Sequence, residues 1–230
     1  MKRALFVRLV GLAGAAPAWL AAPAVAIAAP NGAVGASTIA DAKSVPNANH
    51  KATTNPAHNP VQAELPGNSV YQLKVPLVDQ DAHKTRWDEA PKGPRIVSMF
   101  YSNCDFVCPM LFEAIKIVEA GLPAESRQRL SVGLVSLDPQ RDNPAVLKRT
   151  ANQRSIDETR WRLYRADAAD VRKLAATLGI QYRQLTGGEF NHSTVLILLD
   201  AQGRVMARTE KINAVDPAFM KAVQALTAVG

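Results

Sequence analysis

Cys104 and Cys108 are the two cysteines of this 230-residue chain, and they stand four positions apart. Thiols at this spacing can exchange disulfides with another protein or bind a soft metal ion. A purely structural disulfide is the weaker interpretation, because a loop of about five residues gains roughly 2 kcal/mol by the chain-entropy relation, against about 4.7 kcal/mol for a hundred-residue loop. The pair is therefore predicted to do redox or metal chemistry.

The segments around the cysteines predict a strand, a loop and a helix. Residues 96–101 form an apolar run with β-branched and aromatic side chains, which indicates a buried strand, and the polar turn at residues 102–103 ends it. Pro109 fits a first helical turn, where its missing N–H has no intrahelical partner. Cys108 is thus expected at a helix N-terminus, where free N–H groups and the helix dipole lower the pKa of a thiol.

The rest of the domain is expected to alternate between strands and helices. Further strands are predicted at residues 70–75, 83–87, 130–137, 161–164, 193–199 and 204–208, and helices at residues 109–120, 144–154, 168–178 and from residue 217 onward. Gly121 and Gly179 are expected to cap two of the helices. The pattern predicts an α/β, thioredoxin-like fold over residues 68–230, with a central mixed sheet flanked by helices and an added N-terminal hairpin.

His192 is the third residue with relevant chemistry. Thioredoxin-type oxidoreductases place a proline opposite their dithiol, just before a late strand, but this chain has no proline between Pro144 and Pro217. Here His192 directly precedes the strand expected at residues 193–199. Two thiolates and an imidazole form a soft set of three ligands that suits Cu(I). Zinc is the competing metal, although structural zinc prefers four protein ligands and only three are evident.

Three sequence blocks occur in order along the chain: residues 100–109 with both cysteines, residues 135–142, and Asn191-His192-Ser193. With these blocks, residues 68–228 resemble the SCO/SenC family, the copper chaperones of cytochrome c oxidase. The resemblance implies a metallochaperone and not an enzyme, with copper, Cu(I) or also Cu(II), bound by Cys104, Cys108 and His192. It further implies delivery to the copper centre of oxidase subunit II, by metal transfer, by reduction of that subunit's cysteines, or by both.

Asp138 and Asp105 are acidic residues within these blocks. Asp138 matches an aspartate near the family's metal site that is expected to act in partner contact or as a second shell. An equally good local interpretation is a residue that ends a strand before a proline turn. Asp105 stands where many relatives have proline, which adds a negative charge beside the thiols.

The alternative function is a thiol-disulfide oxidoreductase that reduces the cysteines of exported proteins without delivering metal. In that reaction one cysteine attacks a partner disulfide and the other resolves the mixed disulfide. A peroxidase is a weaker interpretation, because Ser102-Asn103-Cys104 shows no convincing set of peroxide-activating neighbours. A copper donor and a thiol reductant are expected as further partners, and the sequence identifies neither.

The N-terminus has the layout of a secretory signal peptide at residues 1–28. Lys2, Arg3 and Arg8 precede a weakly apolar, alanine-rich stretch, and residues 26–28 form a small-x-small cleavage site. A retained membrane anchor is the alternative. Residues 29–67 are rich in small and polar residues and are expected to be a flexible linker, so His50 and His58 there are interpreted as surface histidines.

The net charge of +7 does not indicate nucleic-acid binding, because the basic residues are scattered along the chain. Export would place the protein in the periplasm or another extracytoplasmic compartment, either free or tethered to the inner membrane by an uncleaved N-terminal segment. Disulfides can form and persist there. The cysteine pair would therefore need a reductant before it could bind copper.

Overall fold

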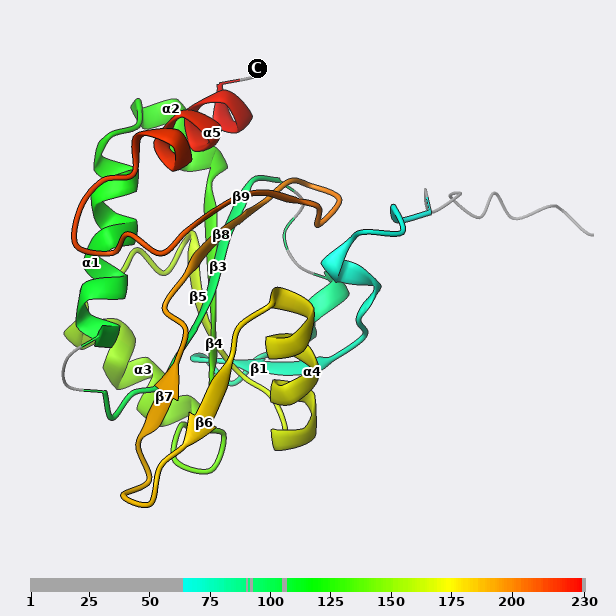
Figure 1. Ribbon diagram of the computed structural model, residues 1–230, viewed down its shortest axis with the longest axis vertical. Coiled ribbons are helices and arrows are strands. Elements are labelled where there is room, and N and C mark those ends of the chain that lie inside the picture. The colour runs from blue at the N-terminus through cyan, green and yellow to red at the C-terminus, as the bar shows by residue number, and fades with distance from the viewer. Residues whose placement is uncertain (1–63, 90, 92, 105–106, 229–230) are drawn as a thin grey trace, which may run out of the picture. The chain divides into compact units, whose positions relative to one another are not determined.

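The computed structural model describes residues 64–89, 91, 93–104 and 107–228 (Figure 1). The signal peptide expected at residues 1–28 lies outside the described residues, as does the linker expected at residues 29–67 apart from its last four positions. His50 and His58 lie outside them as well. Among the described residues, no helix combines the length and the apolar character needed to cross a bilayer.

A mixed sheet of seven strands runs through the domain in the order β2-β1-β5-β4-β3-β8-β9 (Figure 1). The three central strands are parallel, and the strands outside them pair antiparallel with their neighbours. The expected mixed sheet is confirmed, and β1 and β2 form its N-terminal hairpin. The strands are β1 (Pro76–Asp79), β2 (Lys84–Arg86), β3 (Arg95–Phe100), β4 (Ser131–Ser136), β5 (Trp161–Arg165), β8 (Leu196–Leu199) and β9 (Val205–Thr209).

Helices cover both faces of this sheet. Helices α1 (Val107–Ala120), α3 (Pro144–Gln153) and α5 (Pro217–Thr227) pack on one face, and α4 (Ala168–Leu178) packs on the other (Figure 1). The short helix α2 (Ala124–Arg129) was not predicted from the sequence. All six residues of β3 are buried, because alternate side chains point into the two cores. Ile96 belongs to the core beneath α1, and Val97 belongs to the core beneath α4.

Aromatic packing fixes the helix that carries Cys108. Phe112 of α1 meets Phe100 of β3 edge to face, with ring centroids 5.6 Å apart. Phe112 also stacks against Trp161 of β5, with ring centroids 6.0 Å apart. Burial of one such side chain is worth roughly 1.5–3 kcal/mol. The start of α1 is therefore held against the carboxyl end of β3, as expected for a strand–loop–helix unit that presents the cysteines.

The strand predicted at residues 70–75 is wrong. Residues Val70–Gln72 instead form a short 3-10 helix, η1, in which Val70 and Tyr71 are both buried. The Ser69 side chain caps this helix by accepting the Tyr71 N–H at 3.1 Å. Trp87 starts a second 3-10 helix, η2 (Trp87–Glu89), and its indole N–H donates to the Val70 carbonyl at 2.9 Å. The first hairpin strand therefore begins only at residue 76.

The strand predicted at residues 193–199 is shorter than expected, since β8 begins at Leu196. The preceding residues belong to a feature that was not predicted, a separate two-stranded sheet of β6 (Tyr182–Gln184) and β7 (Phe190–His192). We call residues 182–192 the histidine hairpin, because its last residue is His192.

The two predicted glycine caps differ in the structure. Gly179 ends α4 in the left-handed conformation at a φ of +63°, as expected for a glycine cap. Gly121 follows α1 without a left-handed φ. A Cβ at this position would lie 2.4 Å from Cε of Met220 in α5, so the glycine there allows close packing of two helices.

Candidate metal centre

Cys104 and Cys108 lie on either side of the start of α1. Cys104 is in the loop after β3, and Cys108 is the second residue of the helix. The backbone N–H of Cys108 donates to Sγ of Cys104 at 3.3 Å. Both side chains are buried, with 8% of Cys104 and 2% of Cys108 exposed. Cys104 also lines a pocket, so it is the thiol that a partner or a metal ion reaches first.

The two thiols have opposite pKa shifts. Burial opposes ionisation of Cys104, but hydrogen bonds from the backbone N–H and the thiol of Cys108 outweigh it, together with one from the Tyr101 hydroxyl. The pKa of Cys104 is therefore below its ordinary value. Burial raises the pKa of Cys108 well above its ordinary value. Burial and the neighbouring Cys104 raise the pKa of Tyr101 to about 12, so its hydroxyl remains a donor at neutral pH.

The expectation that Cys108 has the lowered pKa is wrong for a geometric reason. The free N–H groups of a first helical turn point away from the helix, toward the residue that precedes it. In this chain they point to the sulfur of Cys104, which takes the place of a capping oxygen. The side chain of Cys108 projects from the helix into the core instead.

We predict that Cys104 reacts with iodoacetamide at least about tenfold faster than Cys108 at pH 7, because the thiolate is the nucleophile. The rate at Cys104 rises with pH and levels off below the ordinary thiol pKa, whereas Cys108 stays unreactive throughout. Mass spectrometry of peptides from timed, reduced samples measures both rates. In guanidinium chloride the two rates become similar; similar rates in the folded protein would contradict the assignment.

His192 faces the same pocket as Cys104. This pocket has a volume of about 210 Å³, and Tyr101, Val107 and Phe190 also line it. Nδ1 of His192 lies 3.2 Å from the carbonyl oxygen of its neighbour Ser193. A carbonyl can only accept, so Nδ1 carries the proton and Nε2 keeps a free lone pair. Burial lowers the pKa of His192, so the ring stays neutral and able to bind metal at a lower pH than free histidine.

The three candidate ligands share this region but do not converge. The sulfurs of Cys104 and Cys108 and a ring nitrogen of His192 do not all lie within 4.8 Å of one another. A copper ion held by all three would require the ligand atoms to move closer together.

Asp79, Asp81 and His83 do meet this distance criterion among the described residues. They form the turn between β1 and β2, where Asp79 Oδ1 accepts the N–H groups of Asp81 and His83 at 2.9 and 2.8 Å. Lys148 pairs with Asp81 at 2.8 Å. These interactions already explain the acidic cluster as a hydrogen-bonded turn.

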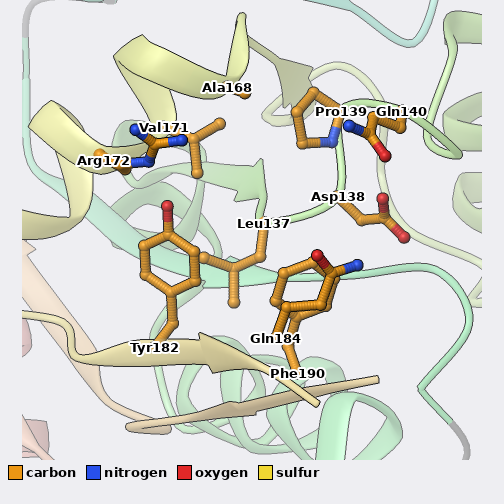
Figure 2. A pocket seen from close by; sticks show the side chains of 10 residues that line it. All are labelled: Leu137, Asp138, Pro139, Gln140, Ala168, Val171, Arg172, Tyr182, Gln184 and Phe190. Carbon is orange, nitrogen blue, oxygen red and sulfur yellow. The ribbon is translucent and has the colours of Figure 1, made fainter. Parts of the chain in front are cut away.

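Asp138 lies at a second pocket, of about 240 Å³, and does not line the pocket of Cys104 and His192. Figure 2 shows Asp138 across this second pocket from Tyr182, with Phe190 below. Phe190 lines both pockets. The carboxylate of Asp138 is almost fully buried and is paired with Arg141. The side-chain contacts of Asp138 are therefore with the surrounding loop.

Asp142 is a residue of this region that sequence reasoning missed. It is fully buried, and its carboxylate accepts the backbone N–H of Ser102 at 3.0 Å, as well as the Ser102 hydroxyl. It also accepts the Ser136 hydroxyl at 2.5 Å. Asp142 thus ties the turn before Cys104 to the end of β4. The sequence signal that could have indicated this role was an acidic residue within the block at residues 135–142.

Comparison with known proteins identifies the family and the fold. The SCO1/SenC family model matches residues 66–227. Copper-bound ScoI from Bradyrhizobium japonicum matches with a TM-score of 0.57 and 18% identity, over 67% of this chain and 98% of that one. BsSco, described as a member of the Sco family of cytochrome c oxidase assembly proteins with a disulfide switch, matches with a TM-score of 0.59 and 16% identity, over 69% and 94% of the two chains.

A candidate copper-binding protein of Stutzerimonas stutzeri is 29% identical over 75 residues. This alignment covers 33% of the present chain and 37% of that protein, so the chain matches little more than a third of this curated relative's length. The structural neighbours establish the thioredoxin-like fold of the domain.

Proposed function

The chain belongs to the SCO1/SenC family, and from this premise we propose that it is a copper metallochaperone whose cargo is held by Cys104, Cys108 and His192. The observation that carries the proposal is that Cys104 and His192 line one pocket, beside a second thiol. Two sulfurs and an imidazole are soft ligands, as Cu(I) prefers. The site supplies a stabilised thiolate and a neutral imidazole with a free Nε2, which are the forms that bind metal.

We further propose that the copper goes to cytochrome c oxidase subunit II. The support is the family membership, together with the similarity to BsSco, which is described as a member of the Sco family of cytochrome c oxidase assembly proteins. The predicted signal peptide supports an extracytoplasmic location. An upstream copper donor and a thiol reductant complete the expected partners.

We predict that His192→Ala lowers the Cu(I) affinity at least about tenfold while a dithiol remains to bind the ion more weakly. Affinity is measured anaerobically on the reduced protein, in competition with a chromogenic Cu(I) chelator. His83→Ala is the matched control, since it removes an exposed histidine of the β1–β2 turn that does not line the pocket of Cys104 and His192. Unchanged affinity in the His192 variant would remove the histidine from the ligand set.

A second candidate function, thiol-disulfide exchange, is supported by the different pKa shifts of the two thiols. Cys104, with its lowered pKa, is suited to attack a partner disulfide, and the buried Cys108 to resolve it. The partner disulfide is then reduced to two thiols, and Cys104 and Cys108 become a disulfide. The His192→Ala variant separates the two candidate functions. We expect it to reduce a model peptide disulfide as the wild-type protein does, while its copper binding is weaker.

A further inference from the structure

In the described part of the chain, the histidine hairpin is not joined to the seven-stranded sheet by strand pairing. Its strands β6 and β7 pair with each other, and neither has a partner strand in the seven-stranded sheet. At its base the Ser193 N–H donates to the Gln181 carbonyl at 2.8 Å. Phe190 packs against Tyr101 with ring centroids 5.3 Å apart. The position of His192 relative to the cysteines therefore depends on side-chain contacts along the hairpin.

Arg141 makes such a contact at the far end of the hairpin. Its guanidinium pairs with the buried carboxylate of Asp138 through Nε and donates to the carbonyl of Gly188 through Nη2. Gly188 has a φ of +82°, and a Cβ at this position would lie 3.3 Å from Nη1 of Arg141. The positive φ therefore favours glycine at this turn, and a Cβ there would press on the guanidinium.

The same loop also holds the cysteine turn. The Asp138 N–H donates to the Ser136 hydroxyl at 2.9 Å, and that hydroxyl donates to Asp142 at 2.5 Å. Asp142 in turn accepts the N–H of Ser102, two residues before Cys104. Residues 136–142 therefore connect the turn that carries Cys104 to the hairpin that carries His192.

We propose that Arg141 is a positioning residue that sets the place of the histidine hairpin, and that Asp138 acts by orienting Arg141. This inference rests on the proposed function, in which His192 binds copper. Arg141 bridges Asp138 and the Gly188 carbonyl. When this bridge is broken, the hairpin tip gains conformational freedom, which must be lost again each time His192 closes on the metal. Lysine would not substitute, because one ammonium cannot reproduce the fixed fork that reaches both partners.

The first test needs no metal. Hydrogen exchange followed by mass spectrometry is compared for the reduced wild-type protein, Arg141→Ala, Arg141→Lys and Asp138→Asn. We expect faster exchange in residues 182–192 in all three variants and unchanged exchange in β8. Arg204→Ala is the matched control, because Arg204 pairs with the buried Asp200 at the β8–β9 turn. Unchanged exchange of the hairpin in Arg141→Ala would overturn the proposal.

The second test is a double-mutant cycle on Cu(I) affinity. We expect Arg141→Ala to weaken binding about tenfold in the wild-type background and less than about twofold in the His192→Ala background, because the bridge acts through that histidine. Equal losses in both backgrounds would overturn the positioning role. If the wild-type protein binds no Cu(I), the proposed function fails, whereas the exchange result still decides whether Arg141 holds the hairpin.

Discussion

Replacement of either Cys104 or Cys108 by serine is expected to abolish the retention of one Cu(I) ion per chain. Structural Zn²⁺ bound by four thiolate or imidazole ligands has a binding free energy of about 10–16 kcal/mol, so we take about 3 kcal/mol as the contribution of one soft ligand. That corresponds to about a hundredfold in Kd, with a further loss because a hydroxyl is a poor ligand for a soft ion. Anaerobic loading, gel filtration and copper-thiolate absorbance measure the bound equivalent.

Serine is nearly the same size as cysteine, so the two variants should remain folded, and circular dichroism checks this. Serine at position 104 can still accept the Cys108 N–H, which keeps the local helix cap. A full equivalent of copper in either variant would show that the metal binds elsewhere. Loss of binding in both variants, together with a smaller loss in His192→Ala, would support a site of two strong ligands and one weaker ligand.

The Asp142→Ala variant is expected to lose about 3 kcal/mol of unfolding free energy. The carboxylate is fully buried and accepts three hydrogen bonds, from the backbone and hydroxyl of Ser102 and from Ser136. Each buried donor left without a partner costs about 1–3 kcal/mol, although the two hydroxyls can rotate to new acceptors. For a domain of this size the melting temperature should fall by roughly 10 °C.

Copper binding should weaken in the same variant, because the turn before Cys104 loses its attachment to β4. Asp142→Asn keeps one acceptor oxygen and should show an intermediate loss of stability. Asp170→Ala is the control, since its carboxylate pairs with Lys173 on the exposed side of α4. Thermal unfolding of the reduced, metal-free proteins measures the effect. A melting temperature within about 2 °C of the wild type would contradict the structural role of Asp142.

The elements around the cysteines were predictable because local signals and burial agree there. The buried strand β3, the helix that starts beside Pro109 and the cap at Gly179 all have short-range causes in hydrophobic pattern and backbone conformation. The segment at residues 70–75 was misjudged because its alternation is only apparent. Trp87, which is distant in sequence, fixes Val70 through a hydrogen bond to its carbonyl.

The sequence by itself determined the fold class and the family, because these depend on residue types and on periods of a few residues. The tertiary structure decided which thiol is ionised more easily, since that depends on where the N–H groups of α1 point. It also decided how His192 is held. The hairpin that carries this residue has no strand partner in the main sheet, and the contact of Arg141 with Gly188 spans 47 residues, a separation over which no local sequence pattern can act.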